Sequence, residues 1–432
     1  MERAEAFLKR QGLSIREIDV AALLRDFESE MAAGLAGRAS SLPMIPAYLS
    51  TGRPVPAGKP VIVIDAGGTH LRVGLVSFNA QGEPRISRFA KRPMPGSEGP
   101  VSGEAFYDTL VACVEPVASE AEAIGFCFSY QAEILPDGDA RLVRWSKQIQ
   151  APEVVGTLVG SGLRDRLAAR GRRLRMVVLN DTVATLLAGR SAGMSRRYEA
   201  YVGFILGTGT NTAYVERHAA IAKVTGLPPG GRMAVNVESG NFARAPRSRF
   251  DEQFDATTSD PGSYLFEKMI SGGYMGGLGL TVLREAAAAG LFSPAAAAAL
   301  AALPALSNKD LDDFCHNPFL ASGALAALPL TDDDRRSAIT LCTPLYARAA
   351  LFTAVNIAAA VIKTGAGRDP LHPVCITVDG STFYRTLTAS LKSRVEEHLR
   401  RILGGHGIFY QLLHVDEAPV IGAAVAGLSL ET

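Results

Sequence analysis

Three short turns rich in glycine and hydroxyl residues each follow an apolar run, and such turns suit the binding of phosphate. They lie at residues 65–69, 207–210 and 379–381. Glycine lets a backbone N–H come close to an anionic oxygen, and a neighbouring Ser or Thr hydroxyl adds a second donor. One such turn is commonly a plain strand connection, whereas three in equivalent positions favour a phosphate site.

The segments after the first two turns distinguish among phosphate-binding folds. Residues 71–76 and 212–216 have the composition of further strands. A Rossmann site or a P-loop instead requires a helix to begin at the glycines. Neither G-x-G-x-x-G nor G-x-x-x-x-G-K-[ST] occurs at these turns. The pattern argues against a dehydrogenase and against a P-loop ATPase.

Asp181 is the acidic residue best placed for chemistry, between an apolar strand at residues 176–179 and a helix expected from Thr182. Asp commonly caps a helix N-terminus, and taken alone the residue favours that structural role. A carboxylate at a helix N-terminus also stays ionised and is a modest base. Capping and proton acceptance are compatible, so both interpretations stay open at this point.

Alternating strand and helix patterns must position these residues. Apolar runs at 61–64, 201–206 and 374–378 predict buried strands. Helical spacing predicts helices over 155–170, 264–285 and 348–363, and over residues 1 to 40 ahead of a proline-rich connector. Strands that alternate with helices predict an α/β fold, and the repeated strand–turn–strand unit suggests two related halves.

Composition limits the class of protein. A chain of 432 residues predicts two domains, and 44 basic against 43 acidic residues give no electrostatic case for nucleic acid or a membrane surface. Five scattered cysteines without C-x-x-C spacing indicate reduced thiols. The charged N-terminus and the absence of about 18 uninterrupted apolar residues predict a soluble, cytoplasmic protein without a membrane partner.

An ordered set of motifs then resembles the hexokinase family, including its bacterial, glucokinase-like members. The resemblance runs along most of the chain, through residues 28–46, 65–72, 128–130, 145–147, 180–186, 206–211, 236–242, 260–272 and 378–381. It implies a two-domain actin-like ATPase (ribonuclease H-like) α/β fold with a sugar-binding cleft between a small and a large domain. Residues 61–181 would form the small domain and 182–417 the large one. Residues 1–60 would join the large domain, and the helix at 418–432 would return to the small one.

The resemblance also implies an activity, the transfer of the γ-phosphate of MgATP to the 6-hydroxyl of a hexose, most simply glucose. The expected partners are a hexose and a nucleotide, and the oligomeric state stays open between monomer and homodimer. Asp181 would be the general base, with Arg72 and Lys147 neutralising negative charge. Asp65 would hold Mg²⁺ through water. The sugar-binding positions would be Ser129, Ser146, Lys147, Asn180, Asp181, Asn211, Glu238 and Glu267. The nucleotide-binding positions would be Asp65, Gly67, Gly68, Thr69, Gly207, Thr208, Gly209, Asp379, Gly380 and Ser381.

The chain departs from the family pattern at two places. In the sugar segments, Gln131, Ser146 and Ser239 stand where proline, threonine and tryptophan are usual, which changes the expected shape of the sugar loops. Near the C-terminus, Pro419 and Ile421 replace a glycine- and serine-rich turn, so a backbone donor is lost at the adenine end. The altered C-terminal turn leaves open a hexokinase that uses a phosphoryl donor other than ATP. A separate alternative is a catalytically quiet hexose sensor with the same cleft, and the presence of Asp65, Asp181, Thr208 and Asp379 argues against it.

Overall fold

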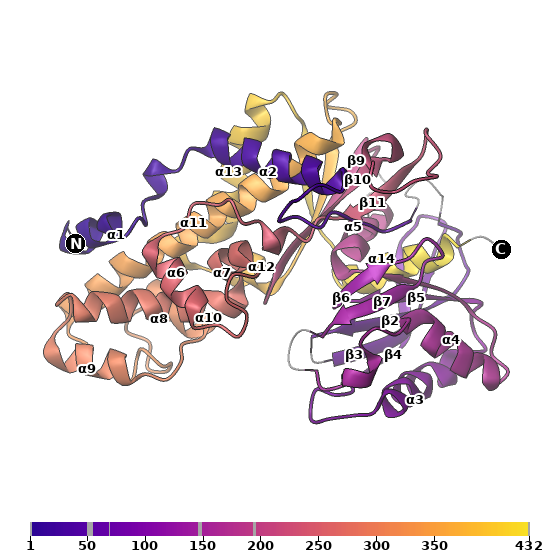
Figure 1. The fold of residues 1–432 in the computed structure, drawn as a ribbon, viewed down its shortest axis with the longest axis horizontal. Helices are drawn as coiled ribbons and strands as arrows, with labels where there is room; N and C mark the ends of the chain where they lie inside the picture. The colour runs from indigo at the N-terminus through magenta and orange to yellow at the C-terminus, as the bar shows by residue number, and fades with distance from the viewer. Residues whose placement is uncertain (1, 50–54, 69, 146–148, 193–195, 431–432) are drawn as a thin grey trace.

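The strands form two main sheets with a helical layer between them. A computed structural model describes residues 2–49, 55–68, 70–145, 149–192 and 196–430. In Figure 1 the smaller sheet lies beside helices α3 and α4, the larger sheet adjoins most of the other helices, and α5 and α14 lie between the two sheets. We call the smaller sheet with its helices the small-sheet lobe, and the larger sheet with its helices the large-sheet lobe.

The small-sheet lobe is built on apolar strands whose residues are almost all buried at its centre. β2 reads Val-Ile-Val-Ile-Asp-Ala-Gly, and its first six residues are buried. The strand order is β4 (Pro84–Pro93), β3 (His70–Phe78), β2 (Val61–Gly67), β5 (Ala123–Phe128) and β8 (Arg175–Leu179). One face packs on α3 (Gly103–Val114) and α4 (Val159–Ala169), and a separate hairpin joins β6 (Gln131–Ile134) to β7 (Ala140–Arg144).

The large-sheet lobe repeats the strand–turn–strand unit predicted from the sequence. β9 (Ala200–Leu206) turns into antiparallel β10 (Thr210–Arg217), as β2 turns into antiparallel β3. The order is β1 (Ile45–Pro46), β11 (Arg232–Asn236), β10, β9, β12 (Val374–Asp379) and β13 (Tyr410–His414). The first two predicted phosphate turns therefore run into strands, as the sequence analysis expected.

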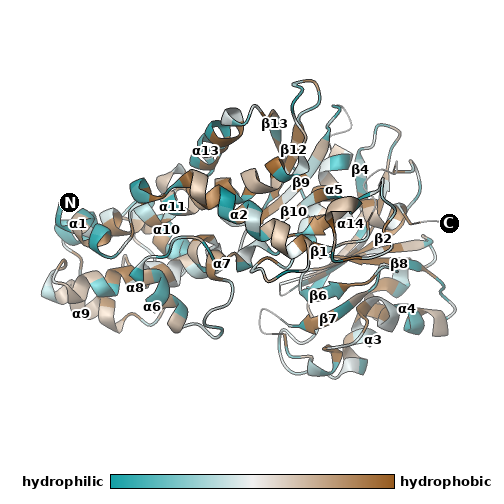
Figure 2. Ribbon diagram, turned by 45° about the horizontal axis from the view of Figure 1, so that its top comes forward, coloured by the Kyte–Doolittle hydropathy of each residue, from teal (hydrophilic) through white to brown (hydrophobic). Residues whose placement is uncertain are grey.

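The helices differ from the expected ones in extent. The helical N-terminal segment consists of two α-helices, α1 and α2, which end at residue 35, and residues 264–285 divide at Ser271 into α7 and α8. Most helices surround the large sheet, and Figure 2 shows the hydrophilic residues of α1 at one end of the molecule. Their bounds are α1 (Glu2–Arg10), α2 (Val20–Leu35), α5 (Asp181–Ala192), α6 (Arg249–Ala256), α7 (Leu265–Ile270), α8 (Gly272–Ala288), α9 (Pro294–Ala302), α10 (Asn308–His316), α11 (Asp332–Thr364), α12 (Ser381–Arg385), α13 (Leu391–Gly405) and α14 (Ala418–Leu428).

The longest helix, α11, is the central helix of the large-sheet lobe. It runs for 33 residues, well beyond the predicted segment 348–363, and it contains Pro344. Among the described residues it is the one helix long and apolar enough to cross a membrane, but 94% of its apolar window is buried inside the protein. Such burial is typical of a core helix in a globular domain.

Helix α14 closes the layer between the sheets by packing directly on α5. A Cβ at Gly422 would lie 1.7 Å from the carbonyl oxygen of Ala184 in α5, so the two helix backbones touch at this point. On its other side α14 contacts β2 and β5. The strand end that carries Asp65 and the helix start that carries Asp181 therefore share one packed layer.

Candidate active site

Asp181 is the first residue of α5, and its neighbour provides the cap. Asn180 Oδ1 accepts a hydrogen bond from the Thr182 backbone N–H at 2.8 Å, which is the N-cap interaction. The expectation that Asp181 caps the helix by its side chain is therefore wrong. Its carboxylate accepts a hydrogen bond from Thr182 Oγ1 at 3.2 Å and is only partly buried. Because Asn180 takes the capping role, the Asp181 carboxylate is available to a ligand.

A cluster of amides and a carboxylate lies next to Asp181. Asn211 Nδ2 donates to Asn236 Oδ1 at 2.8 Å and lies 3.4 Å from both Asn180 Oδ1 and Glu238 Oε1. Asn236 Nδ2 donates to Glu238 Oε1 at 2.7 Å. The structure thus brings together three predicted sugar-binding residues: Asn180 directly after β8, Asn211 in β10 and Glu238 in the loop after β11. Asn236, buried between them, was not predicted, although it opens the segment that contains Glu238.

The second phosphate turn is tied to the helix that carries Glu267. Glu267 Oε2 accepts from the Thr210 backbone N–H at 2.8 Å, and a Cβ at Gly209 would lie 2.6 Å from the same oxygen. Two further backbone bonds join Gly272 N–H to the Gly207 carbonyl and Gly273 N–H to the Thr208 carbonyl, both at 2.9 Å. The carboxylate of Glu267, which is predicted to bind sugar, and the second predicted phosphate turn are therefore held in one rigid unit.

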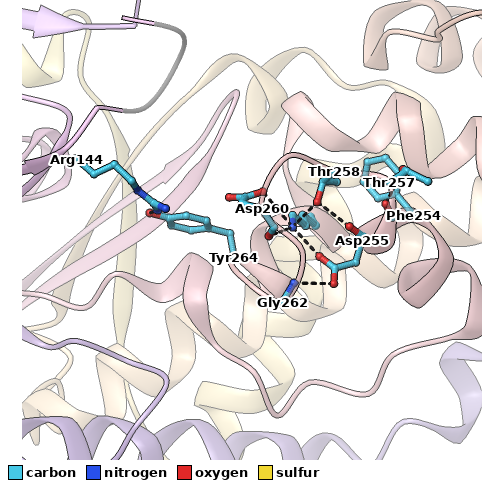
Figure 3. A network of polar contacts seen from close by, with 9 residues as sticks. Arg144, Phe254, Asp255, Thr257, Thr258, Asp260, Gly262 and Tyr264 are labelled. Atoms are coloured by element: carbon cyan, nitrogen blue, oxygen red, sulfur yellow. Dashed lines mark hydrogen bonds and ion pairs between the residues drawn. The ribbon is translucent and has the colours of Figure 1, made fainter. Parts of the chain in front are cut away.

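The helix that bears Glu267 is fixed by a buried lysine. Lys268 is 3% exposed, and its Nζ lies 2.6 Å from Asp255 Oδ1 and 2.9 Å from the Asp260 carbonyl oxygen. Asp255 also accepts from the Gly262 backbone N–H at 2.9 Å. Figure 3 shows how these contacts gather the loop before α7 around one cation. Burying a charge is costly unless it is paired, and here the pairing orders the loop.

The first phosphate turn joins β2 to β3 and carries a buried carboxylate. Asp65 is 1% exposed and forms an ion pair with Arg72, its cross-strand partner. Arg72 also reaches Glu417 at the start of α14, at 2.5 Å. A Cβ at Gly67 would lie 3.5 Å from Asp65 Oδ1 and 3.6 Å from Ser129 Oγ. Glu417 is a second partner of Arg72 that sequence reasoning missed, because 345 residues separate the two.

The third turn packs against the second. Gly380 has φ +113°, and a Cβ there would lie 2.3 Å from the Leu206 carbonyl oxygen, so only glycine fits. Its N–H donates to Asp379 Oδ1 at 2.7 Å. Ser381 is the first residue of α12, and Thr382 Oγ1 donates to the Gly207 carbonyl at 2.8 Å. In the first turn, Gly68 also has positive φ, and its carbonyl accepts from Tyr130 Oη at 3.0 Å.

Negative charge is concentrated around Asp181. Burial raises the pKa of the Asp65 carboxyl, which Arg72 opposes, and burial also raises the pKa of Glu238 and of Asp379. The charge of Asp181 raises each of these three pKa values further. Asp181 therefore lies within electrostatic reach of all three carboxylates, at the meeting point of the amide cluster and the phosphate turns.

Three of the predicted site residues, Thr69, Ser146 and Lys147, lie outside the described residues. The others fall into the groups given above, which meet where β2, β8, β9 and β12 end. A small cavity between the hairpin β6–β7 and the amide cluster is lined by Asn180, Asn236 and Glu238 together with Phe128 and Tyr130. Two of its polar lining residues, Asn180 and Glu238, are among those expected to bind a sugar.

Comparison with known proteins gives one consistent result. Two sequence profiles, each described as hexokinase, match residues 8–191 and 201–429. Hexokinase-1 of Spinacia oleracea is 30% identical over 93% of this chain and 85% of its own length. A Schistosoma mansoni hexokinase solved with glucose superposes with a TM-score of 0.80 at 24% identity, over 99% of both chains. Another hexokinase crystal structure gives 0.82 at 24% identity over 100% of both. The two-lobed α/β fold is thus that of these enzymes and fits the actin-like ATPase architecture.

Proposed function

Since the chain belongs to the hexokinase family of hexose phosphotransferases, we propose that it transfers the γ-phosphate of MgATP to the 6-hydroxyl of glucose. The observation that carries the proposal is the division of roles at the start of α5. Asn180 caps the helix, and the Asp181 carboxylate next to it remains open to a ligand beside the amide cluster. We also propose a cytoplasmic location, which the burial of α11 supports.

The amide cluster and two carboxylates suit a ring of hydroxyl groups. Each sugar hydroxyl donates and accepts, and Asn211, Glu238 and Glu267 offer both kinds of partner around one space. A buried polar group left unpaired is costly, so a sugar that lacks one hydroxyl should bind much more weakly. Binding in this way would leave the 6-hydroxyl beside Asp181.

Asp181 would accept the proton of the 6-hydroxyl as the sugar oxygen bonds to phosphorus and the bond to the leaving diphosphate breaks. Phosphoryl transfer has a loose transition state, so the nucleophile needs positioning more than a strong base. The backbone N–H groups of the glycine turns and Thr208 would hold the phosphates, and Arg72 would offset the charge that builds up on them.

Asp65 is suited to orient a Mg²⁺-bound water. Both its carboxylate oxygens are buried, and within the described part of the chain their partners are the Arg72 ion pair and the weakly donating thiol of Cys127. Mg²⁺ commonly keeps several waters and takes few protein ligands, so one buried carboxylate suffices. When bound, the ion would neutralise charge on the donor phosphates.

One observation favours a second candidate, a donor other than ATP. Helix α14 begins at Ala418 with Pro419 in its first turn, and the residues from Ala418 onward are buried. The glycine- and serine-rich turn that is usual in the family would offer free backbone N–H groups. In this chain the first turn of α14 occupies the same position. Glu417 adds a negative charge beside Arg72, where a nucleotide phosphate would gain from a cation.

A coupled assay separates these candidates. The purified chain is incubated with Mg²⁺ and with glucose, mannose or fructose, in turn with ATP, ADP, pyrophosphate or polyphosphate, and sugar phosphate is measured. Turnover with ATP and glucose supports the proposal. Turnover with polyphosphate alone supports the second candidate. Glucose binding without turnover with any donor contradicts both and indicates a sensor.

A further inference from the structure

A polar contact joins the two lobes outside the residues assigned above. Arg144 Nη2 donates to Tyr264 Oη at 2.8 Å, and the guanidinium carbon lies 5.5 Å from the centre of the phenol ring. Tyr264 Oη donates in turn to Gln131 Oε1 at 3.4 Å. Figure 3 shows the Arg144 side chain directed at Tyr264. We call Gln131, Arg144 and Tyr264 the clasp.

The small-sheet side of the clasp is a cross-strand pair. Gln131 opens β6, Arg144 ends β7, and the two residues face each other in the register of the hairpin. Their side chains therefore offer an acceptor and a donor to the same hydroxyl. Gln131 is one of the positions at which the chain departs from the family pattern, and the clasp gives that departure a role.

On the large-sheet side of the clasp, the backbone of Tyr264 has an unusual conformation. Tyr264 has φ +51°, which is uncommon for a bulky residue and is found where the surroundings enforce it. Its carbonyl accepts from the Lys268 backbone N–H at 3.0 Å, and the buried Lys268 network fixes the loop on the other side. Tyr264 is thus rigidly placed one turn before Glu267.

The phenol shares its surroundings with the sugar carboxylates. Burial raises the pKa of Tyr264, Arg144 opposes this, and the charges of Glu238 and Glu267 raise the pKa further. Tyr264 is therefore within electrostatic reach of both carboxylates. The clasp stands at the edge of the candidate sugar site and spans the two lobes that form it.

We propose that Gln131, Arg144 and Tyr264 are positioning residues that hold the two lobes together at the sugar site and set its affinity for hexose. The inference rests on the proposed function. Because the clasp stands beside the site and does not include the reacting groups, it would stabilise the closed arrangement of the two lobes equally for bound sugar and for the transition state. Its loss should therefore raise KM for hexose and leave kcat nearly unchanged.

The test combines steady-state kinetics with a binding titration. Trp145 is the one tryptophan of the chain and adjoins Arg144, so its fluorescence reports glucose binding without a label. The variants are Tyr264→Phe, Arg144→Gln and the double variant. Each single variant should raise the glucose Kd and KM about 10-fold, with kcat within about 2-fold of wild type. The double variant should also raise the glucose Kd and KM by only about 10-fold, because the two side chains act through one contact.

Matched controls are Arg141→Gln and Tyr198→Phe. Arg141 lies on the same strand β7 but contacts Gly156 and Glu133 of its own lobe, and Tyr198 bonds Gln411 of its own lobe. Both controls should keep wild-type KM. An unchanged or lowered KM in the clasp variants would contradict the proposed role of the clasp. So would an additive increase in KM of about 100-fold in the double variant. Absence of turnover in the wild-type chain would instead contradict the proposed function.

Discussion

At the scale of single residues, the site depends on how two neighbours share one helix start. Asn and Asp are about equally good N-caps, so the sequence Asn180-Asp181 does not say which residue caps. The structure assigns the cap to Asn180 and leaves Asp181 with Thr182 Oγ1 as a weak partner at 3.2 Å. A residue-type argument predicted the presence of a cap and misplaced it by one position.

The raised pKa of Glu238 predicts a pH-dependent stability effect. At low pH the Glu238 carboxyl is protonated in both the folded and the unfolded protein, so it does not lower the free energy of unfolding. As pH rises through its raised folded pKa, the folded protein must give up a proton in a buried, negative site, so stability is lost. Glu238→Gln removes that loss. In the absence of sugar, the melting temperature of the variant should exceed that of wild type by a margin that grows as the pH rises above the ordinary pKa of a Glu carboxyl and levels off above the raised folded pKa.

The exposed Glu104 of α3 provides the control for this prediction. Glu104→Gln removes no buried carboxylate and should therefore not raise the melting temperature as the pH rises. If the difference in melting temperature between Glu238→Gln and wild type is constant across the pH range, then ionisation of Glu238 does not destabilise the folded protein. The electrostatic description of the site would then be wrong.

At the scale of elements, local patterns predicted strands better than helix ends. The strand–turn–strand units at β2–β3 and β9–β10 were predictable because apolar runs and glycines lie next to each other in the sequence. The break between α7 and α8 was not. It arises because Gly272 and Gly273 bond the carbonyls of Gly207 and Thr208, which are about 65 residues away, instead of continuing one helix.

The contact of α14 with α5 predicts an effect of a single methyl group. Gly422→Ala would force a Cβ to 1.7 Å from the Ala184 carbonyl oxygen, so the helices must move apart. We expect a loss of about 2 kcal/mol in the free energy of unfolding, measured by urea denaturation. The matched change Gly404→Ala, at an exposed position of α13, meets nothing within 4 Å and should gain about 0.5 kcal/mol from helix propensity. Equal stability of the two variants would contradict the described packing.

At the scale of the whole molecule, the resemblance predicted the fold and the structure confirms it, whereas the boundaries at residues 61, 181 and 418 stay a prediction. The arrangement between the lobes was beyond the reach of the sequence. The Arg72–Glu417 and Arg144–Tyr264 contacts join residues 345 and 120 positions apart. Pairings at such distances depend on the packed fold and leave no local pattern.

Two lobes that share one sugar site should close on it. Carboxylates and amides from both sides would gain partners when glucose bridges them, which favours a hinged closure. Small-angle X-ray scattering of the chain with saturating glucose should give a smaller radius of gyration than the free chain, and mannitol at the same concentration should leave it unchanged. Identical curves with and without glucose would count against closure.

The central claim is that Asp181 accepts the proton of the sugar hydroxyl. Asp181→Asn keeps the shape at the start of α5 and removes the base. The measurement is glucose phosphorylation by the purified variant, paired with a Trp145 fluorescence titration of glucose. Asp165→Asn is the control, because Asp165 is an exposed residue of α4. We predict that kcat falls by about 10³-fold while the glucose Kd stays within about 5-fold of wild type. Turnover near the wild-type rate in Asp181→Asn would contradict the role of Asp181 as the base.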